Sequence, residues 1–192
     1  ELPAASRKVD YEGEIAFEGS ARRISDPQAA HGLGIVAMYQ EPTVFEDLTV
    51  AENVFAGRHL RTRFGTVDWG AMRVETARIL GEMAVGIDPD TPVRGLGVAD
   101  RQLLEVAKAL SASARLLIMD EPTAALSPHE VDSLFATVRR LRDRGVAVLY
   151  ISHRLEEIGE LADVVTVIRD GRHIETRPAD ELSQAEIIRL MV

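Results

Sequence analysis

Residues 116–122, Leu-Leu-Ile-Met-Asp-Glu-Pro, decide how the rest of the sequence is interpreted. Four apolar residues form a run typical of a buried strand, and two adjacent carboxylates follow at its C-terminal end. Two more apolar runs of strand length, 35–39 and 146–151, also end in polar side chains, at Gln40 and His153. Unalternating runs of this kind are typical of parallel strands covered on both faces. Since ligands bind at the carboxyl edge of such sheets, these polar groups are expected to converge there.

The adjacent carboxylates suit phosphate chemistry. Asp120 has the chemistry to hold Mg²⁺ directly or through water, and Glu121 to orient or deprotonate an attacking water. Each residue alone has a plainer explanation: the Asp-Glu pair can begin a solvated loop, His153 can be structural, and Gln40 can simply leave its strand. The coincidence of three such strand ends favours a functional site.

The stretch between the apolar runs 35–39 and 116–119 differs in character. Between Leu48 and Leu110, helical patterns cover residues 50–55, 69–83 and 102–110, separated by Gly and Pro. We therefore expect a mainly helical subdomain inserted into the fold. The predicted units are residues 1–42, 43–110 and 111–192.

Strands and helices alternate outside that insertion. A half-buried strand is expected over residues 13–18, a turn at 170–171, and helices behind the capping boxes at 127–130 and 183–186. Such alternation predicts an α/β fold with a mostly parallel sheet and helices on both faces.

Composition narrows the classes of function. The 192 residues carry 31 acidic and 22 basic side chains, a net charge of −9, which argues against nucleic acid as a partner because phosphate-binding surfaces are basic. The absence of cysteine excludes disulfides and thiolate metal sites. No apolar run approaches the roughly 20 residues that span a bilayer. We expect a cytoplasmic protein.

Four segments in a fixed order resemble the ATPase domain of ATP-binding-cassette (ABC) proteins, and the resemblance covers nearly all of residues 13–192. That family implies a P-loop NTPase-like cassette with an inserted helical subdomain. The segments are 39–41 (Tyr-Gln-Glu), 96–102 (Leu-Gly-Val-Ala-Asp-Arg-Gln), 118–123 (Ile-Met-Asp-Glu-Pro-Thr) and 151–153 (Ile-Ser-His).

The resemblance implies a role for each matching residue, with ATP and Mg²⁺ as cofactors. Gln40 would be the Q-loop glutamine, which senses Mg²⁺ or the attacking water and links to the transport partner. Asp120 would be the Walker B aspartate that holds Mg²⁺, Glu121 the catalytic glutamate, and His153 the switch histidine that contacts the γ-phosphate. The signature motif, which closes on ATP bound by the opposite cassette, would be formed by Leu96, Gly97, Val98, Ala99 and Asp100.

Four further segments resemble those of ribose- or xylose-type sugar importers: 11–15, 48–53, 151–155 and 167–171. Such proteins carry two cassettes in one chain, and residues 190–192 resemble the close of the first. The implied partners are a second cassette, membrane permease subunits and, indirectly, an extracytoplasmic sugar-binding protein. The implied location is the inner face of the cell membrane.

One element of the family pattern is missing from these residues. The Walker A loop, Gly-x-x-x-x-Gly-Lys-Ser/Thr, needs a lysine after glycine, whereas Lys8 follows Arg7 and Lys108 follows Ala107. The family places the loop just before the 13–18 strand, and we expect its own strand to lie beside the strand that ends at Asp120. The N-terminal P-loop part is thus expected to be missing, which predicts a fragment that binds ATP weakly or not at all.

The signature is also altered, because Gly97 replaces the serine that bonds the γ-phosphate and Asp100 adds charge near it. A catalytically deficient cassette with a regulatory or scaffolding role is therefore the alternative to an import ATPase. A soluble ABC ATPase of translation or DNA repair is a third possibility. It is disfavoured by the acidic net charge and by the segments that resemble sugar importers.

Overall fold

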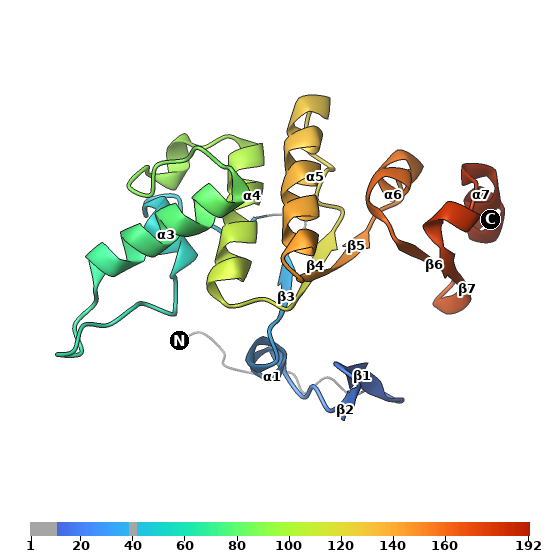
Figure 1. The fold of residues 1–192 in the computed structure, drawn as a ribbon, viewed down its shortest axis with the longest axis horizontal. Coiled ribbons are helices and arrows are strands. Elements are labelled where there is room, and N and C mark those ends of the chain that lie inside the picture. The colour runs from blue at the N-terminus through green and yellow to red at the C-terminus, as the bar shows by residue number, and fades with distance from the viewer. Residues whose placement is uncertain (1–10, 39–41) are drawn as a thin grey trace.

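The computed structural model describes residues 11–38 and 42–192, arranged as an α/β fold (Figure 1). Short 3-10 helices lie at Val93–Gly95 and Ala179–Glu181. The strands are β1 Ile15–Phe17, β2 Ser20–Arg22, β3 Ile35–Met38, β4 Leu116–Asp120, β5 Ala147–Ile151, β6 Val164–Arg169 and β7 Arg172–Pro178. The α-helices are α1 Pro27–Gly32, α2 Val50–Val54, α3 Trp69–Met83, α4 Val98–Ser111, α5 Pro128–Asp143, α6 Leu155–Leu161 and α7 Gln184–Met191.

The central sheet has the parallel order β3-β4-β5. Its register aligns Met38 with Met119, and Asp120 with Ile151, so that the strands end at a common edge. Because β4 pairs on both sides, no further strand can pair beside it. The expectation that the phosphate-loop strand lies next to the Asp120 strand is therefore wrong. Within the described part of the chain, β3 and β5 are the two edge strands of this sheet.

Only one face of the central sheet is covered. Leu117 and Met119 of β4 are buried in the main core, which α4 and α5 share. The opposite face carries Leu149 and Ile151, which are 51% and 45% exposed. The expectation of strands covered on both faces is thus wrong for these residues, because the described helices pack on one side only. The first strand differs as well: β1 was expected to be half-buried but is mostly exposed.

The inserted helical region lies between β3 and β4. In Figure 1, α3 and α4 lie to one side of α5, while α6, α7 and the β6–β7 hairpin lie to the other. Gly34 joins α1 to β3 with a φ of +78°, and a Cβ there would come within 2.9 Å of the Arg115 side chain. A glycine is therefore required where β3 approaches the start of β4. The Gly34 carbonyl accepts hydrogen bonds from the backbone of Arg115 and Leu116.

The C-terminal part has its own small core, formed by Val165, Val167 and Ile187. Strands β6 and β7 form an antiparallel hairpin, and the turn residues Asp170 and Gly171 have φ values of +52° and +71°. Two consecutive positive φ angles favour Asp-Gly and match strand twist, so the predicted turn is confirmed.

Local signals for helices are also confirmed. The predicted helix 69–83 agrees with α3, and the capping boxes of Ser127 with Glu130 and of Ser183 with Glu186 are both present. Helix α4 begins earlier than the predicted residue 102, because Val98 to Arg101 continue its first turn.

We expect Thr76→Val to stabilise the protein. Thr76 of α3 is 0% exposed, and its hydroxyl has no hydrogen-bond partner among the described residues. Removing an unsatisfied buried hydroxyl should raise the free energy of unfolding by about 1 kcal/mol in urea titrations. Thr137→Val is the matched control and should destabilise, since that buried hydroxyl donates to the Ser133 carbonyl at 3.1 Å. A loss of stability in Thr76→Val would contradict the prediction.

Candidate active site

The carboxylate pair lies at the C-terminal end of β4. Asp120 is the last residue of the strand and is exposed. Glu121 follows with a φ of +44°, a left-handed conformation unusual for a side chain other than glycine. Its backbone N–H donates to the carbonyl of Ile151 at 3.0 Å, which ties this loop to the end of β5. Left-handed backbone of this kind concentrates at functional sites.

The histidine at the end of β5 lies against this carboxylate. His153 Nδ1 is 3.0 Å from Glu121 Oε1, and both side chains remain partly exposed. The parallel register places these residues together, since Asp120 and Ile151 are aligned at the sheet edge. The structure therefore brings Glu121 and His153 into contact. Gln40, the third predicted member of the site, lies outside the described residues.

A buried carboxylate behind this pair escaped the sequence analysis. Glu157, in the first turn of α6, is 4% exposed and accepts hydrogen bonds from three hydroxyl groups. Ser152 and Tyr150 donate to Oε2 at 2.8 and 3.0 Å, and Thr123 donates to Oε1. Arg154 Nη1 completes the cluster at 3.2 Å from Oε1.

The environment of Glu157 affects its neighbour Tyr150. Burial, and secondly the nearby Glu157 carboxylate, raise the pKa of the Tyr150 hydroxyl well above its ordinary value. The hydroxyl therefore keeps its proton and remains a donor across the ordinary pH range. The sequence offered one signal for this cluster: Glu157 lies four residues before the apolar Leu161, which places both on one face of α6.

The predicted signature residues begin α4. Gly97 is the N-cap, without a side chain to cap the helix, and Val98, Ala99 and Asp100 form the first turn. The helix begins within this motif, four residues before the predicted start at residue 102, and its free N–H groups are of the kind that attract anions. Across residues 11–38 and 42–192, no hydrogen bond joins residues 97–100 to the loops of Glu121 and His153.

Comparison with known proteins shows which family the chain belongs to. Residues 4–124 match the sequence profile of the family described as ABC transporter. The chain belongs to the ABC transporter family. Two solved cassettes share its fold: a nucleotide-free ATP-binding cassette from an ABC transporter and the ABC protein cbiO1 of Clostridium perfringens. Their TM-scores are 0.76 and 0.75 at 23% and 22% identity; each alignment covers 93% of this chain, and 73% and 71% of those chains.

Curated relatives of this ABC transporter chain are named as sugar import proteins. The ribose import ATP-binding protein RbsA 2 of Streptomyces avermitilis is 48% identical over 180 residues, covering 94% of this chain and 36% of the relative. The xylose import ATP-binding protein XylG of Photobacterium profundum is 44% identical over 183 residues, covering 95% and 36%. The chain thus spans about a third of the length of these relatives.

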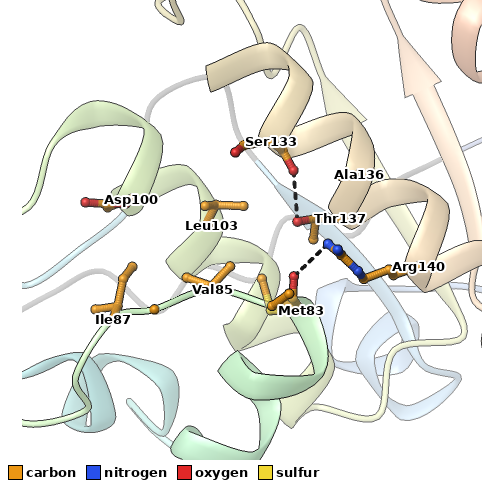
Figure 2. Close-up of a pocket in the computed structure, with 11 residues that line it drawn as sticks. Met83, Val85, Ile87, Asp100, Leu103, Ser133, Ala136, Thr137 and Arg140 are labelled. Atoms are coloured by element: carbon orange, nitrogen blue, oxygen red, sulfur yellow. Dashed lines mark hydrogen bonds between the residues drawn. The ribbon is translucent and has the colours of Figure 1, made fainter. Parts of the chain in front are cut away.

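A cavity of about 390 Å³ lies away from the Glu121–His153 contact in this ABC transporter chain. Figure 2 shows it between the end of α3, the start of α4 and one face of α5. Asp100 is the predicted binding residue in its wall, opposite Arg140, which donates to the Met83 carbonyl at 3.1 Å. Asp120, Glu121 and His153 do not line it.

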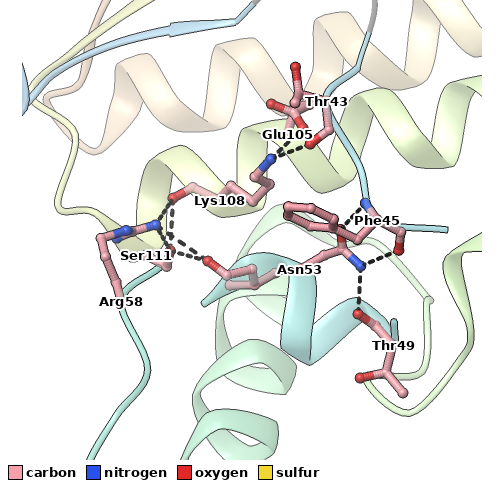
Figure 3. Close-up of polar contacts among 9 residues, drawn as sticks. Thr43, Phe45, Thr49, Asn53, Arg58, Glu105, Lys108 and Ser111 are labelled. Atoms are coloured by element: carbon pink, nitrogen blue, oxygen red, sulfur yellow. Dashed lines mark hydrogen bonds and ion pairs between the residues drawn. The ribbon is translucent and has the colours of Figure 1, made fainter. Parts of the chain in front are cut away.

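Residues 43–45, which follow Gln40, are hydrogen-bonded to the helical region of the ABC fold (Figure 3). Lys108 Nζ of α4 donates to the Thr43 carbonyl at 2.8 Å and pairs with Glu105 at 2.7 Å. Asn53 of α2 is 0% exposed; its Oδ1 accepts from Phe45 N–H at 2.8 Å, and its Nδ2 donates to the Phe45 carbonyl at 3.0 Å. The chain that leaves the predicted Q-loop is thus held against α2 and α4.

No three His, Cys, Asp or Glu side chains of the described residues gather closely enough to form a metal site by themselves. A magnesium ion that binds with substrate phosphates and waters needs only one or two carboxylates, and the exposed Asp120 suits that requirement. No helix in the described part of the chain is both long and apolar enough to cross a membrane.

Proposed function

We propose that the protein containing this chain hydrolyses MgATP to drive the import of a sugar through a membrane permease. The observation that carries the proposal is the 3.0 Å contact between His153 and Glu121 at the carboxyl edge of the parallel sheet. Support for the sugar comes from the names of the relatives, which are ribose and xylose import ATP-binding proteins.

We infer a separate task for each residue. Asp120 would hold Mg²⁺, which when bound neutralises charge on the phosphates. Glu121 would orient the attacking water and accept its proton. With Nδ1 of His153 directed at Glu121, its Nε2 is left to contact the γ-phosphate. Gln40 would couple these events to the transport partner.

Catalysis of this kind requires further partners. Gly97, Val98, Ala99 and Asp100 would close on ATP held by a second cassette, since helix N-termini attract phosphate. Permease subunits would dock on the pair, and an extracytoplasmic binding protein would supply the sugar to them. The protein would then lie peripherally on the cytoplasmic face of the membrane. The units 1–42, 43–110 and 111–192 would be the first core part, the helical subdomain and the second core part.

One observation favours an alternative, a cassette with a regulatory or scaffolding role. Gly97 presents no hydroxyl at the N-cap of α4, where the family's serine would contact the γ-phosphate. The ATP site completed by this motif would then turn over slowly. The intact Glu121 and His153 weigh against the alternative.

Transport by cells tests the proposal. Deleting the gene for the protein that contains this chain should abolish ATP-dependent uptake of labelled ribose or xylose, and the purified protein with its permease should release phosphate from MgATP. Uptake of both sugars that survives deletion would contradict the import role. Binding of ATP without phosphate release would support the regulatory alternative.

A further inference from the structure

The buried carboxylate of Glu157 connects the two loops that carry the predicted catalytic pair. Thr123, two residues after Glu121, donates to its Oε1. Ser152, directly before His153, donates to its Oε2 at 2.8 Å. One side chain therefore bonds both loops, each beside its functional residue.

Burying a carboxylate is costly unless its oxygens are satisfied, and this one is fully satisfied. Each oxygen has two donors: Thr123 and Arg154 at Oε1, Tyr150 and Ser152 at Oε2. Ser152 Oγ also accepts from the Arg154 backbone N–H at 3.0 Å, which fixes the bend of the chain around His153. Networks of this type hold their members in one geometry.

The neighbouring carboxylate lacks these contacts. Glu156 is exposed and makes no hydrogen bond or ion pair among the described residues, although it lies in the same turn of α6. A carboxylate in this turn is therefore not enough to link the two loops. The link depends on the inward direction of the Glu157 side chain and on hydrogen-bond donors from both loops.

We propose that Glu157 is a positioning residue that sets the separation and orientation of Glu121 and His153 for hydrolysis. The inference rests on the proposed function, because it takes these two residues as the hydrolytic pair. Displacements near 1 Å at reacting groups can lower rates by up to about a hundredfold, whereas nucleotide binding is shared among several contacts, of which the one from His153 is a single member. Loss of Glu157 should therefore act on kcat and leave KM nearly unchanged.

The test uses Glu157→Gln in the protein that contains this chain, assembled with its permease. The amide keeps the size of the side chain, but its NH₂ group replaces one carboxylate oxygen. The two donors that bonded that oxygen then face another donor, and their hydrogen bonds are lost. We expect kcat for ATP hydrolysis to fall about tenfold or more, with KM for ATP within about threefold. Glu156→Gln, the matched control, removes the same charge from the same turn and should keep kcat within about twofold of wild type.

A second variant guards against a folding defect. Ser152→Ala removes a single donor, and Glu157 keeps its other partners; kcat should fall severalfold in the same pattern. As a readout without activity, the ¹⁵N ring signals of His153 should shift in both variants and not in Glu156→Gln. A folded Glu157→Gln protein with wild-type kcat, or unshifted His153 signals, would overturn the inference.

The proposed function is tested separately by Glu121→Gln. If Glu121→Gln retains full hydrolysis, the assignment of the catalytic pair fails, and this inference fails with it. If Glu121→Gln is inactive while Glu157→Gln matches wild type, only the inference about Glu157 fails.

Discussion

Replacing Glu121 by glutamine should lower the rate of ATP hydrolysis on the order of 10³-fold in the protein that contains this chain. The amide has the shape of the carboxylate and tolerates the same backbone, but it cannot accept a proton from the attacking water. The Glu121 side chain is partly exposed and contacts His153 at 3.0 Å, so the change should leave the fold intact. Phosphate release measures the rate.

Nucleotide binding provides the companion measurement for that variant. Affinity for a fluorescent ATP analogue should stay within a few-fold of wild type, because Glu121 is expected to act on the water and not on the phosphates. Glu156→Gln serves again as the charge-matched control. Undiminished hydrolysis in Glu121→Gln would contradict the assignment of this residue.

Replacing Asn53 by alanine should lower the free energy of unfolding by about 3 kcal/mol. The side chain is fully buried and bonds both the N–H and the carbonyl of Phe45, with a further bond to the Thr49 carbonyl at 2.9 Å (Figure 3). Truncation leaves buried backbone groups without partners and opens a small void, each of which costs about 1–3 kcal/mol.

Urea unfolding of the purified protein measures this effect. Thr76→Val is a useful comparison, since it also changes a fully buried polar residue of the helical region but removes no hydrogen bond. A loss below about 1 kcal/mol in Asn53→Ala would show that the segment after Phe45 finds other partners. A large loss would identify Asn53 as a main anchor between the helical region and the chain that follows Gln40.

Local sequence patterns predicted where helices begin and run better than they predicted which strand faces are buried. The capping box at Ser127 and the helical periodicity of 69–83 depend on neighbours within a few residues, and both agree with the structure. The prediction that β5 is covered on both faces was wrong, because the exposure of Leu149 depends on which other segments pack against that strand. Apolar composition alone does not carry that information.

The candidate site divides in the same way. Parallel strands that end at one edge were enough to predict that Glu121 and His153 would converge. Glu157 was missed, because charged residues in a short helix are usually solvated, and only tertiary packing turns this one inward. The roles given to Asp120, Gln40 and residues 97–100 remain predictions that the proposed experiments address.

The left-handed backbone at Glu121 has a consequence for directed evolution of this protein. Any residue with a Cβ has a conformational cost of about 1 kcal/mol there, which glycine avoids. A library screened only for heat resistance should therefore enrich glycine at this position and lose the carboxylate. Thermostable variants are best selected with turnover as a simultaneous criterion, since durability and chemistry favour different residues at this position.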